Sequence, residues 1–205
     1  MTPSEQLLGK LGPWPFAVLW AVWLIYWRVS ARGAKHNEGV ESRASRLSHM
    51  LPPLIGLLVV MATQPPSGFF TPRLLPFGIA SYATSFGMVA LGLAFTVWAR
   101  VHLGVNWSAY VARKREPELV RSGPYAWVRH PIYTGLLLAF LGVAVGRGDL
   151  GALLGCGLMW YGLLRKLRIE ERWLQQTFGD AYARYRDEVP RVVPWPRGPS
   201  LLPRR

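Results

Sequence analysis

Residues that often carry catalytic or metal chemistry are scarce in this chain of 205 residues. Cys156 is the only cysteine, so no disulfide can form within the chain, and a buried thiol is the simplest interpretation. The four histidines lack the spacing of metal ligands, which argues against a metal site. The sequence also has no GxGxxG, P-loop, GxSxG or HExxH motif, so soluble nucleotide folds and the common hydrolase and zinc-protease sites are not supported.

Charged residues are also few, at 17% of the chain, whereas 51% of the residues are hydrophobic. Long apolar runs recur, and a bilayer requires about 20 mostly apolar residues for each tilted helix. We therefore predict an all-α integral membrane protein with about five transmembrane helices. The predicted spans are Pro13–Trp27, Leu51–Thr63, Phe77–Ala99, Ile132–Val145 and Leu150–Leu164.

The first apolar run differs from a signal peptide. It contains four tryptophans, has no basic residue before it beyond Lys10, and ends without a small-residue cleavage site. We expect it to be retained as a membrane span.

Acidic charge is the scarcer kind, with 11 Asp and Glu against 24 Lys and Arg, for a net charge of +13. The segments on one side of the membrane hold only three basic residues: Lys10 before the first span, Arg73 between the second and third, and Arg147 between the fourth and fifth. The segments on the other side hold the remaining 21. The positive-inside rule then predicts a non-cytoplasmic N-terminus and a cytoplasmic C-terminus. The basic charge indicates topology and contact with lipid headgroups, and no nucleic-acid partner.

The fourth and fifth spans are joined by the short link Gly146–Asp149, so we expect an antiparallel hairpin. The start of one and the end of the other must then lie on the same side of the membrane. Glycines at Gly142, Gly146, Gly151 and Gly155 have small-xxx-small spacing, which allows backbones to approach closely.

A first polar stretch, SGPYAWVRHPIYTG at 122–135, precedes the fourth span. Pro131 suits the first position of a helix, and the free N–H groups of a helix start, reinforced by Arg129, favour an anion such as a carboxylate or phosphate. The structural alternative makes Arg129 a headgroup anchor, Tyr133 an interfacial belt residue and His130 a helix cap. This stretch by itself does not decide between an anion site and these structural roles.

A second polar stretch, LRKLRIEERWLQQTFGDAYARY, follows the fifth span. On a helix, Glu170 and Glu171 flank an apolar stripe formed by Leu167, Leu174 and Phe178. Carboxylates in such a stripe require partners, which an arginine or a bound cation would provide. The alternative is a surface helix with pairs three residues apart.

Two segments of the chain resemble the isoprenylcysteine carboxyl methyltransferase family, and its short prokaryotic-type members in particular. They are GPYAWVRHPIYTG at 123–135 and EERWLQQTFGDAYARY at 170–185. The upstream segments ELVRSG and LGVNWS extend the resemblance over residues 100–193. It implies a membrane-bound catalytic region there. The spans within residues 1–99 carry few polar side chains, which suits a transmembrane scaffold, and residues 194–205 form a Pro- and Arg-rich tail.

The resemblance also implies S-adenosylmethionine as cofactor and assigns residues to its site. The residues implied around the cofactor are Leu119, Val120, Gly123, Tyr125, His130, Pro131, Tyr133 and Glu171. Glu170 or Glu171 would complete the pocket, and Arg165 would orient the carboxylate of the substrate, so the catalytic set is Arg165, Glu170 and Glu171. Many relatives have histidine where this chain has Pro117, which removes one expected cofactor contact.

The implied reaction is methylation of a carboxylate on a lipophilic, isoprenylcysteine-like substrate at the cytoplasmic side of the membrane. It needs no general base, because an acid with a pKa of about 4 is already ionised at neutral pH. The protein must instead align donor and acceptor and exclude water.

Three other functions remain open. Phospholipid N-methyltransferases share a related Arg-His-Pro motif and act on an amine, and nicotinamide-dependent sterol-type reductases end in a similar segment. A membrane scaffold or transporter subunit whose basic loops meet anionic lipid would need no cofactor. The identity of the methyl acceptor and the oligomeric state are not readable from the sequence.

Overall fold

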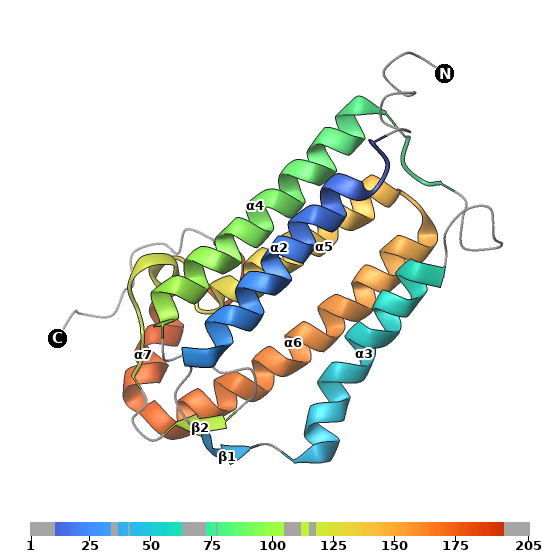
Figure 1. Cartoon of the computed structure of the whole chain (residues 1–205). Coiled ribbons are helices and arrows are strands. Elements are labelled where there is room, and N and C mark those ends of the chain that lie inside the picture. The colour runs from blue at the N-terminus through green and yellow to red at the C-terminus, as the bar shows by residue number, and fades with distance from the viewer. Residues whose placement is uncertain are drawn as a thin grey trace.

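In the computed structural model, the described residues are 11–33, 37–40, 42–62, 73–76, 78–104, 112–114 and 118–194. Over these residues the chain forms a bundle of long helices (Figure 1). The long helices are α2 (Trp14–Ser30), α3 (Arg43–Ala62), α4 (Ile79–Leu103), α5 (Pro131–Arg147) and α6 (Leu150–Phe178). The shorter elements are η1 (Ala31–Gly33), β1 (Asn37–Val40), β2 (Ala112–Lys114), η3 (Gly123–Ala126) and α7 (Asp180–Glu188).

Each of the five predicted apolar runs lies within or largely overlaps one long helix, so the prediction of a helical protein is confirmed. By length and apolar composition, α4 is the one helix among the described residues that qualifies as membrane-spanning, and α5 is a shorter apolar helix. The all-α prediction missed an antiparallel pair of short strands, in which Asn37 of β1 lies opposite Lys114 of β2. Strands of four and three residues are too short to show an alternating apolar pattern.

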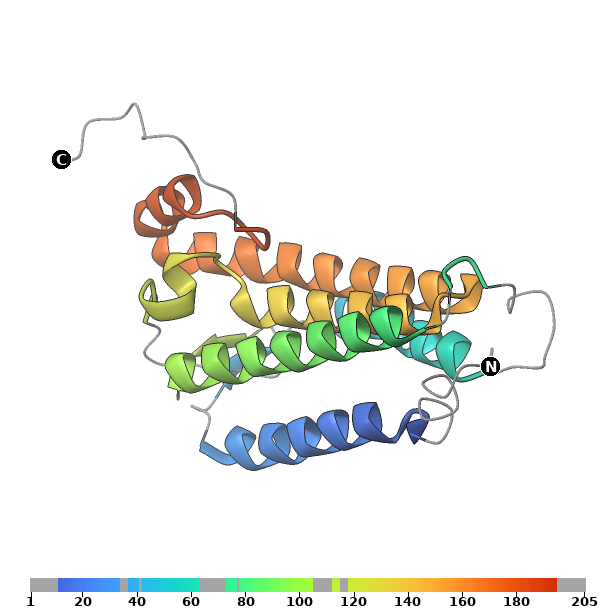
Figure 2. The same cartoon turned by 90° about the horizontal axis from the view of Figure 1, so that it is seen from above.

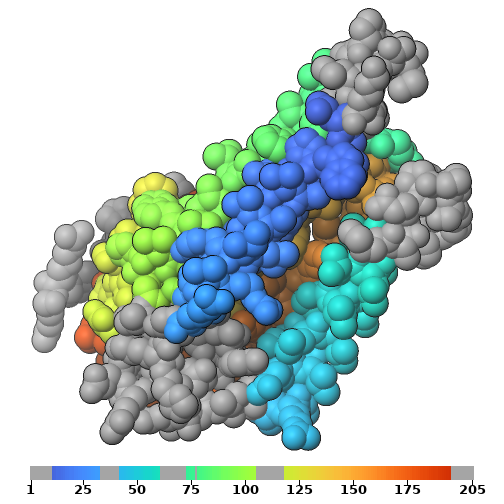
Figure 3. All heavy atoms as spheres, viewed as in Figure 1, coloured from blue at the N-terminus to red at the C-terminus, as the bar shows by residue number. Residues whose placement is uncertain are grey.

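The long helices pack as two pairs, α4 with α5 and α3 with α6, and α2 lies along α4 (Figure 2). Gly92 of α4 and Gly135 of α5 cross so closely that a Cβ atom on Gly92 would lie 2.5 Å from the Gly135 carbonyl oxygen. Trp23 of α2 donates a 2.6 Å hydrogen bond from Nε1 to Thr96 Oγ1 of α4. At the surface, a furrow separates α2 from α3, and α6 is visible at its floor (Figure 3).

The predicted hairpin of the fourth and fifth spans is confirmed by α5 and α6. Gly148 ends α5 with a positive φ of 61°, and Asp149 caps α6 by accepting a 2.8 Å hydrogen bond from Ala152 N. The small residues of the hairpin, however, mainly face other helices. Gly142 contacts α4 at Ser85, and Gly155 contacts α3 at Val60 and Gly56. The close approaches therefore build the two helix pairs.

α6 continues well beyond the predicted span, as one helix of 29 residues. It ends at Gly179, whose positive φ of 50° lets α7 turn back toward the start of α5. The end of α4, the start of α5, the end of α6 and α7 therefore gather at one end of the bundle (Figures 1 and 2). This is where both polar stretches of the sequence lie.

Candidate active site

The start of α5 is held by the segment that follows α7. Arg129 N donates to Pro190 O at 2.9 Å, and His130 N donates to Arg191 O at 3.1 Å. Further along, Thr134 Oγ1 donates to Val192 O at 2.6 Å. His130 is the N-cap residue and Pro131 the first residue of α5, as predicted. The two backbone N–H groups just before the helix are therefore occupied by backbone carbonyls.

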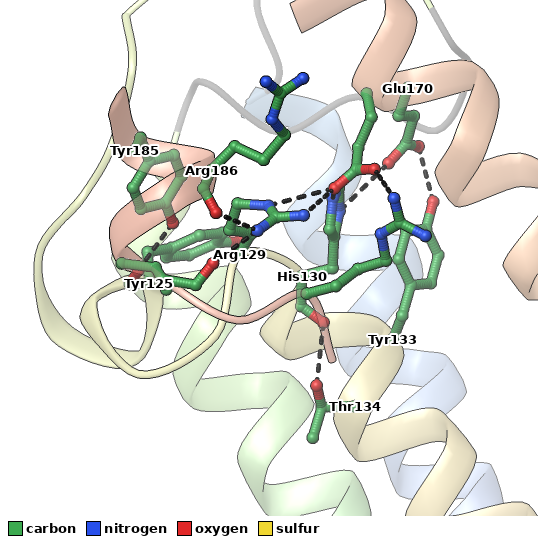
Figure 4. A network of polar contacts seen from close by, with 11 residues as sticks. Tyr125, Arg129, His130, Tyr133, Thr134, Glu170, Tyr185 and Arg186 are labelled. Carbon is green, nitrogen blue, oxygen red and sulfur yellow. Dashed lines mark hydrogen bonds and ion pairs between the residues drawn. The ribbon is translucent and has the colours of Figure 1, made fainter. Parts of the chain in front are cut away.

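Arg129 is the most buried charged side chain of this region, with 3% of its side chain exposed. It donates to Glu171 Oε1 from Nη2 at 2.6 Å and from Nε at 3.1 Å. Its Nη1 group donates to the carbonyls of Arg186 at 2.9 Å and Val189 at 2.5 Å (Figure 4). Arg129 is therefore not a headgroup anchor, because its guanidinium joins α5, α6 and the end of α7 inside the protein.

Glu171 accepts contacts from three cationic or potentially cationic side chains. Besides Arg129, His130 Nε2 lies 3.3 Å from Oε1, and Arg191 Nη2 lies 2.7 Å from Oε2. Burial by itself would raise the pKa of the Glu171 carboxyl, but the hydrogen bonds and charges of His130 and Arg129 outweigh burial and hold that pKa below its usual range. Glu171 is therefore an ionised carboxylate with its hydrogen-bonding capacity largely used.

Glu170 has a different environment on the neighbouring face of α6. Tyr133 donates a 2.6 Å hydrogen bond from its hydroxyl to Glu170 Oε1 (Figure 4). The other oxygen lies 3.9 Å from His130 Nδ1, and Lys166 Nζ lies 3.9 Å from Oε1. The Glu170 side chain is 24% exposed, compared with 10% for Glu171. Glu170 can therefore meet a ligand.

The sequence of this chain is also similar to the sequences of known proteins. A family model described as phospholipid methyltransferase matches residues 80–181, about half of the chain. The protein-S-isoprenylcysteine O-methyltransferase of Schizosaccharomyces pombe is 36% identical over 129 residues, which cover 61% of this chain and 55% of that protein. Over these residues the chain is similar to phospholipid methyltransferases and to isoprenylcysteine O-methyltransferases.

Two further relatives are also methyltransferases by name. Protein-S-isoprenylcysteine O-methyltransferase B of Arabidopsis thaliana is 29% identical over 119 residues, covering 56% of this chain and 60% of that protein. Methanethiol S-methyltransferase of Mycobacterium tuberculosis is 42% identical over 73 residues, covering 35% of this chain and 29% of that protein. The chain spans about half the length of the isoprenylcysteine relatives it matches.

The loop before α5 contains two more of the predicted cofactor residues, Gly123 and Tyr125. Gly123 has a positive φ of 57°, and a Cβ atom there would lie 2.6 Å from the His102 ring. Tyr125 is buried, and its carbonyl accepts a 2.6 Å hydrogen bond from the Tyr185 hydroxyl. Burial, and then the charge of Glu170, raise the pKa of the Tyr125 hydroxyl. The Tyr125 hydroxyl therefore stays protonated at neutral pH.

The structure brings most, but not all, of the predicted residues together. His130, Tyr133, Glu170 and Glu171 form one connected cluster, and Pro131 starts the helix that carries two of them. The remaining three residues lie apart from this cluster. Leu119 packs against the apolar cluster around Tyr182 of α7, and the next residue, Val120, is half-buried. Arg165 donates to Ser48 Oγ of α3 at 3.2 Å. Pro117 and residues 105–108 of LGVNWS lie outside the described residues.

From the sequence, Arg129 stayed open between an anion site and a headgroup anchor, and Arg191 and Thr134 were not among the predicted site residues. The Arg-His-Pro motif was the available signal for Arg129. Arg191 and Thr134 had no signal, because no local pattern of residues predicts contacts across 20 positions, from Arg191 to Glu171, or across 58, from Thr134 to Val192. Only folding of α7 back onto α5 creates these contacts.

Proposed function

We propose that this chain is an integral membrane methyltransferase that uses S-adenosylmethionine to methylate the carboxylate of a lipophilic, isoprenylcysteine-like substrate. The observation that carries the proposal is the pair of carboxylates at the bundle end. Glu171 is fixed by Arg129 and His130, while Glu170 is partly exposed beside Tyr133. The names of the isoprenylcysteine relatives support the substrate class.

The residues present suit a cationic methyl donor. A partly exposed carboxylate next to aromatic rings is a favourable environment for a positively charged group. The rings of His130 and Tyr133 lie 5.7 Å apart beside Glu170. S-adenosylmethionine, when bound, supplies an activated methyl group on a positively charged sulfur. Glu170, Tyr133, His130 and the loop residues Gly123 and Tyr125 would hold it.

The protein's own contribution is positioning. A carboxylate oxygen of the substrate forms the new bond to the methyl carbon as the bond from carbon to sulfur breaks, so the two charges cancel and no proton has to move. In this proposal Arg165 orients that carboxylate, although it lies apart from the cluster; Ser48 accepts from its Nε group, which leaves its terminal nitrogens for the substrate. An arginine can bind a carboxylate through two parallel hydrogen bonds.

The surface of the bundle supports membrane embedding. Among the described residues α2 has no buried side chain, and large apolar residues such as Val22, Ile25, Leu54 and Leu58 are about half exposed or more on α2 and α3. Exposed apolar area of this extent requires a lipid or protein partner. We propose five spans with the N-terminus outside and the site in the cytoplasm, residues 1–99 serving as scaffold and 100–193 as the catalytic region.

A second candidate is methylation of an amine on a lipid headgroup, which the match to the phospholipid methyltransferase model favours. An amine acceptor must lose a proton before it attacks, so its rate should rise with pH through the amine pKa. A carboxylate acceptor is already ionised, and its rate should change little over the same range. The pH dependence of methyl transfer therefore separates the two candidates.

The decisive experiment uses detergent-purified full-length protein. Binding of S-adenosylmethionine is measured first, and transfer of a labelled methyl group to an S-prenylated N-acetylcysteine second. We expect binding at or below millimolar cofactor, and a base-labile methyl ester as product. No binding at millimolar cofactor would overturn the proposal. Binding with transfer only to an aminophospholipid would select the second candidate.

A further inference from the structure

A cleft of about 340 Å³, lined in part by Glu171, lies between the end of α6, α7 and the segment after α7. Its lining residues are Arg168, Glu171, Arg172, Gln175, Tyr182, Arg186 and Arg191. Four arginines thus surround one carboxylate, and that carboxylate is already paired with Arg129. The cleft therefore carries a clear excess of positive charge.

Two of the arginines repel one another. Arg168 and Arg172 are four residues apart on α6, and like charges at this spacing destabilise a helix. Neither has an ion-pair or hydrogen-bond partner among the described residues, whereas Arg186 has Asp187 at 3.7 Å and Arg191 has Glu171. An anion bridging Arg168 and Arg172 would relieve this repulsion.

Buried polar atoms also lack partners at the cleft. Tyr182 is only 1% exposed, and among the described residues its hydroxyl forms no hydrogen bond of regular geometry, with Glu171 and Arg129 as its nearest charged neighbours. The amide oxygen of Gln175 is likewise buried without a partner. Burial and the charge of Glu171 raise the pKa of the Tyr182 hydroxyl, so it remains a donor at neutral pH. A buried polar group without a regular hydrogen bond is rare in proteins, and an acceptor bound in the cleft would complete the hydrogen bonding of Tyr182.

We propose that this cleft binds the phosphate group of an anionic lipid, with Arg168, Arg172 and Tyr182 as its main donors. A phosphate offers more negative charge and more acceptor oxygens than one carboxylate, which suits several arginines. Arg168 lies about 27 Å along α6 from Leu150, close to the thickness of bilayer hydrocarbon. The lipid source rests on the proposed membrane embedding; the phosphate site itself does not.

The test is lipid retention by the purified full-length protein in neutral detergent, measured by native mass spectrometry. The probes are a short-chain phosphatidic acid and a phosphatidylcholine with the same chains, with inorganic phosphate as a competitor. The variants are the double change Arg168→Gln and Arg172→Gln, and Tyr182→Phe, which removes only the hydroxyl. Arg184→Gln is the matched control, because Arg184 is an exposed arginine of α7 outside the cleft.

We expect wild type and Arg184→Gln to retain phosphatidic acid in preference to phosphatidylcholine. The double variant should bind about tenfold more weakly, and Tyr182→Phe several-fold more weakly, with unchanged thermal unfolding. Equal binding by all four proteins would overturn the site. Binding of inorganic phosphate with the same variant pattern but no lipid retention would keep the phosphate site and refute its lipid source.

Competition between S-adenosylmethionine and phosphatidic acid provides a further test of the cleft. If S-adenosylmethionine displaces phosphatidic acid, and the double variant binds the cofactor more weakly, the cleft holds the carboxylate of the cofactor and the proposal is wrong. If the protein binds phosphatidic acid with the expected pattern but transfers no methyl group, the proposed function fails while the phosphate site stands.

Discussion

Glu170 and Glu171 are neighbours on α6, yet their side chains lie in different environments. Glu171 is bound by Arg129, His130 and Arg191, and its role is to hold α5, α6 and the segment after α7 together. Glu170 has the Tyr133 hydroxyl and a partly open side. We therefore expect substitutions at the two positions to have different consequences, the first on stability and the second on cofactor binding.

Replacing Glu171 by glutamine should lower the free energy of unfolding by roughly 3 kcal/mol, because Arg129 would remain buried without a counter-charge. Unfolding of detergent-purified variants by denaturant or heat measures the change. Glu188→Gln is the matched control: Glu188 pairs with Arg121, but both side chains are about half exposed, so we expect a loss of less than about 1 kcal/mol. Equal stability of the two variants would contradict the assigned role of Glu171.

Glu170→Gln and Tyr133→Phe should each weaken binding of S-adenosylmethionine by about tenfold, because each removes one member of a charge-assisted hydrogen-bonded pair. Both proteins should unfold at nearly the wild-type temperature. Tyr161→Phe provides the control, since Tyr161 is exposed on α6 and remote from this pair. Wild-type cofactor affinity in both variants would refute the placement of the cofactor beside Glu170.

Acid should destabilise the protein through Glu171. The pKa of this carboxyl in the folded protein is lower than its unfolded value of about 4.3, so its stabilising contribution is complete above that pH and is lost as the pH falls toward the folded-state value. Unfolding midpoints measured from neutral pH downward should fall below about pH 4.3. Glu171→Gln should remove this part of the pH dependence, and an unchanged profile would contradict it.

At the scale of elements, close contact between glycines holds α4 against α5 and α3 against α6. Gly92 and Gly135 cross at backbone distance, as do Gly56 and Gly155. Tyr133 lies on α5 with His130 at its N-cap, and α6 carries both glutamates, so each crossing holds one of the two site helices against a scaffold helix.

Gly92→Ala should therefore destabilise the bundle by about 1–3 kcal/mol, because its new methyl group would meet the Gly135 carbonyl and the Ala139 backbone nitrogen, which cannot move easily. Gly87→Ala lies on the same helix with no atom within 4 Å of the new methyl group. That control should be neutral or slightly stabilising. Thermal unfolding in detergent compares the two, and equal values would rule out tight packing at Gly92.

For the whole molecule, an uneven distribution of basic charge along an apolar bundle predicts its orientation. Five spans place the two termini on opposite sides of the membrane. A protease-cleavable tag at the N-terminus should be cut from outside intact cells, and the same tag at the C-terminus only after the membrane is opened. Cleavage of both tags from the same side would indicate an even number of spans and contradict the topology.

The sequence by itself determined the positions of the five long helices, the hairpin of α5 and α6, and the start of α5 at His130 and Pro131. These features follow from local properties: the length of apolar runs, a link too short for anything but a hairpin, and a proline that fits a helix start. Family resemblance further selected His130, Tyr133, Glu170 and Glu171, which the fold then brings into one cluster.

Only the tertiary structure decided the separate environments of the two glutamates. Their angular positions on α6 differ, but the distinction depends on which groups α5 and the returning segment present to each face. Arg129 pairs with Glu171 across 42 positions of sequence, and the backbone contacts from residues 129–130 to 190–191 exist because Gly179 turns α7 back. Such contacts arise from packing between distant segments, so no local pattern of residues predicts them.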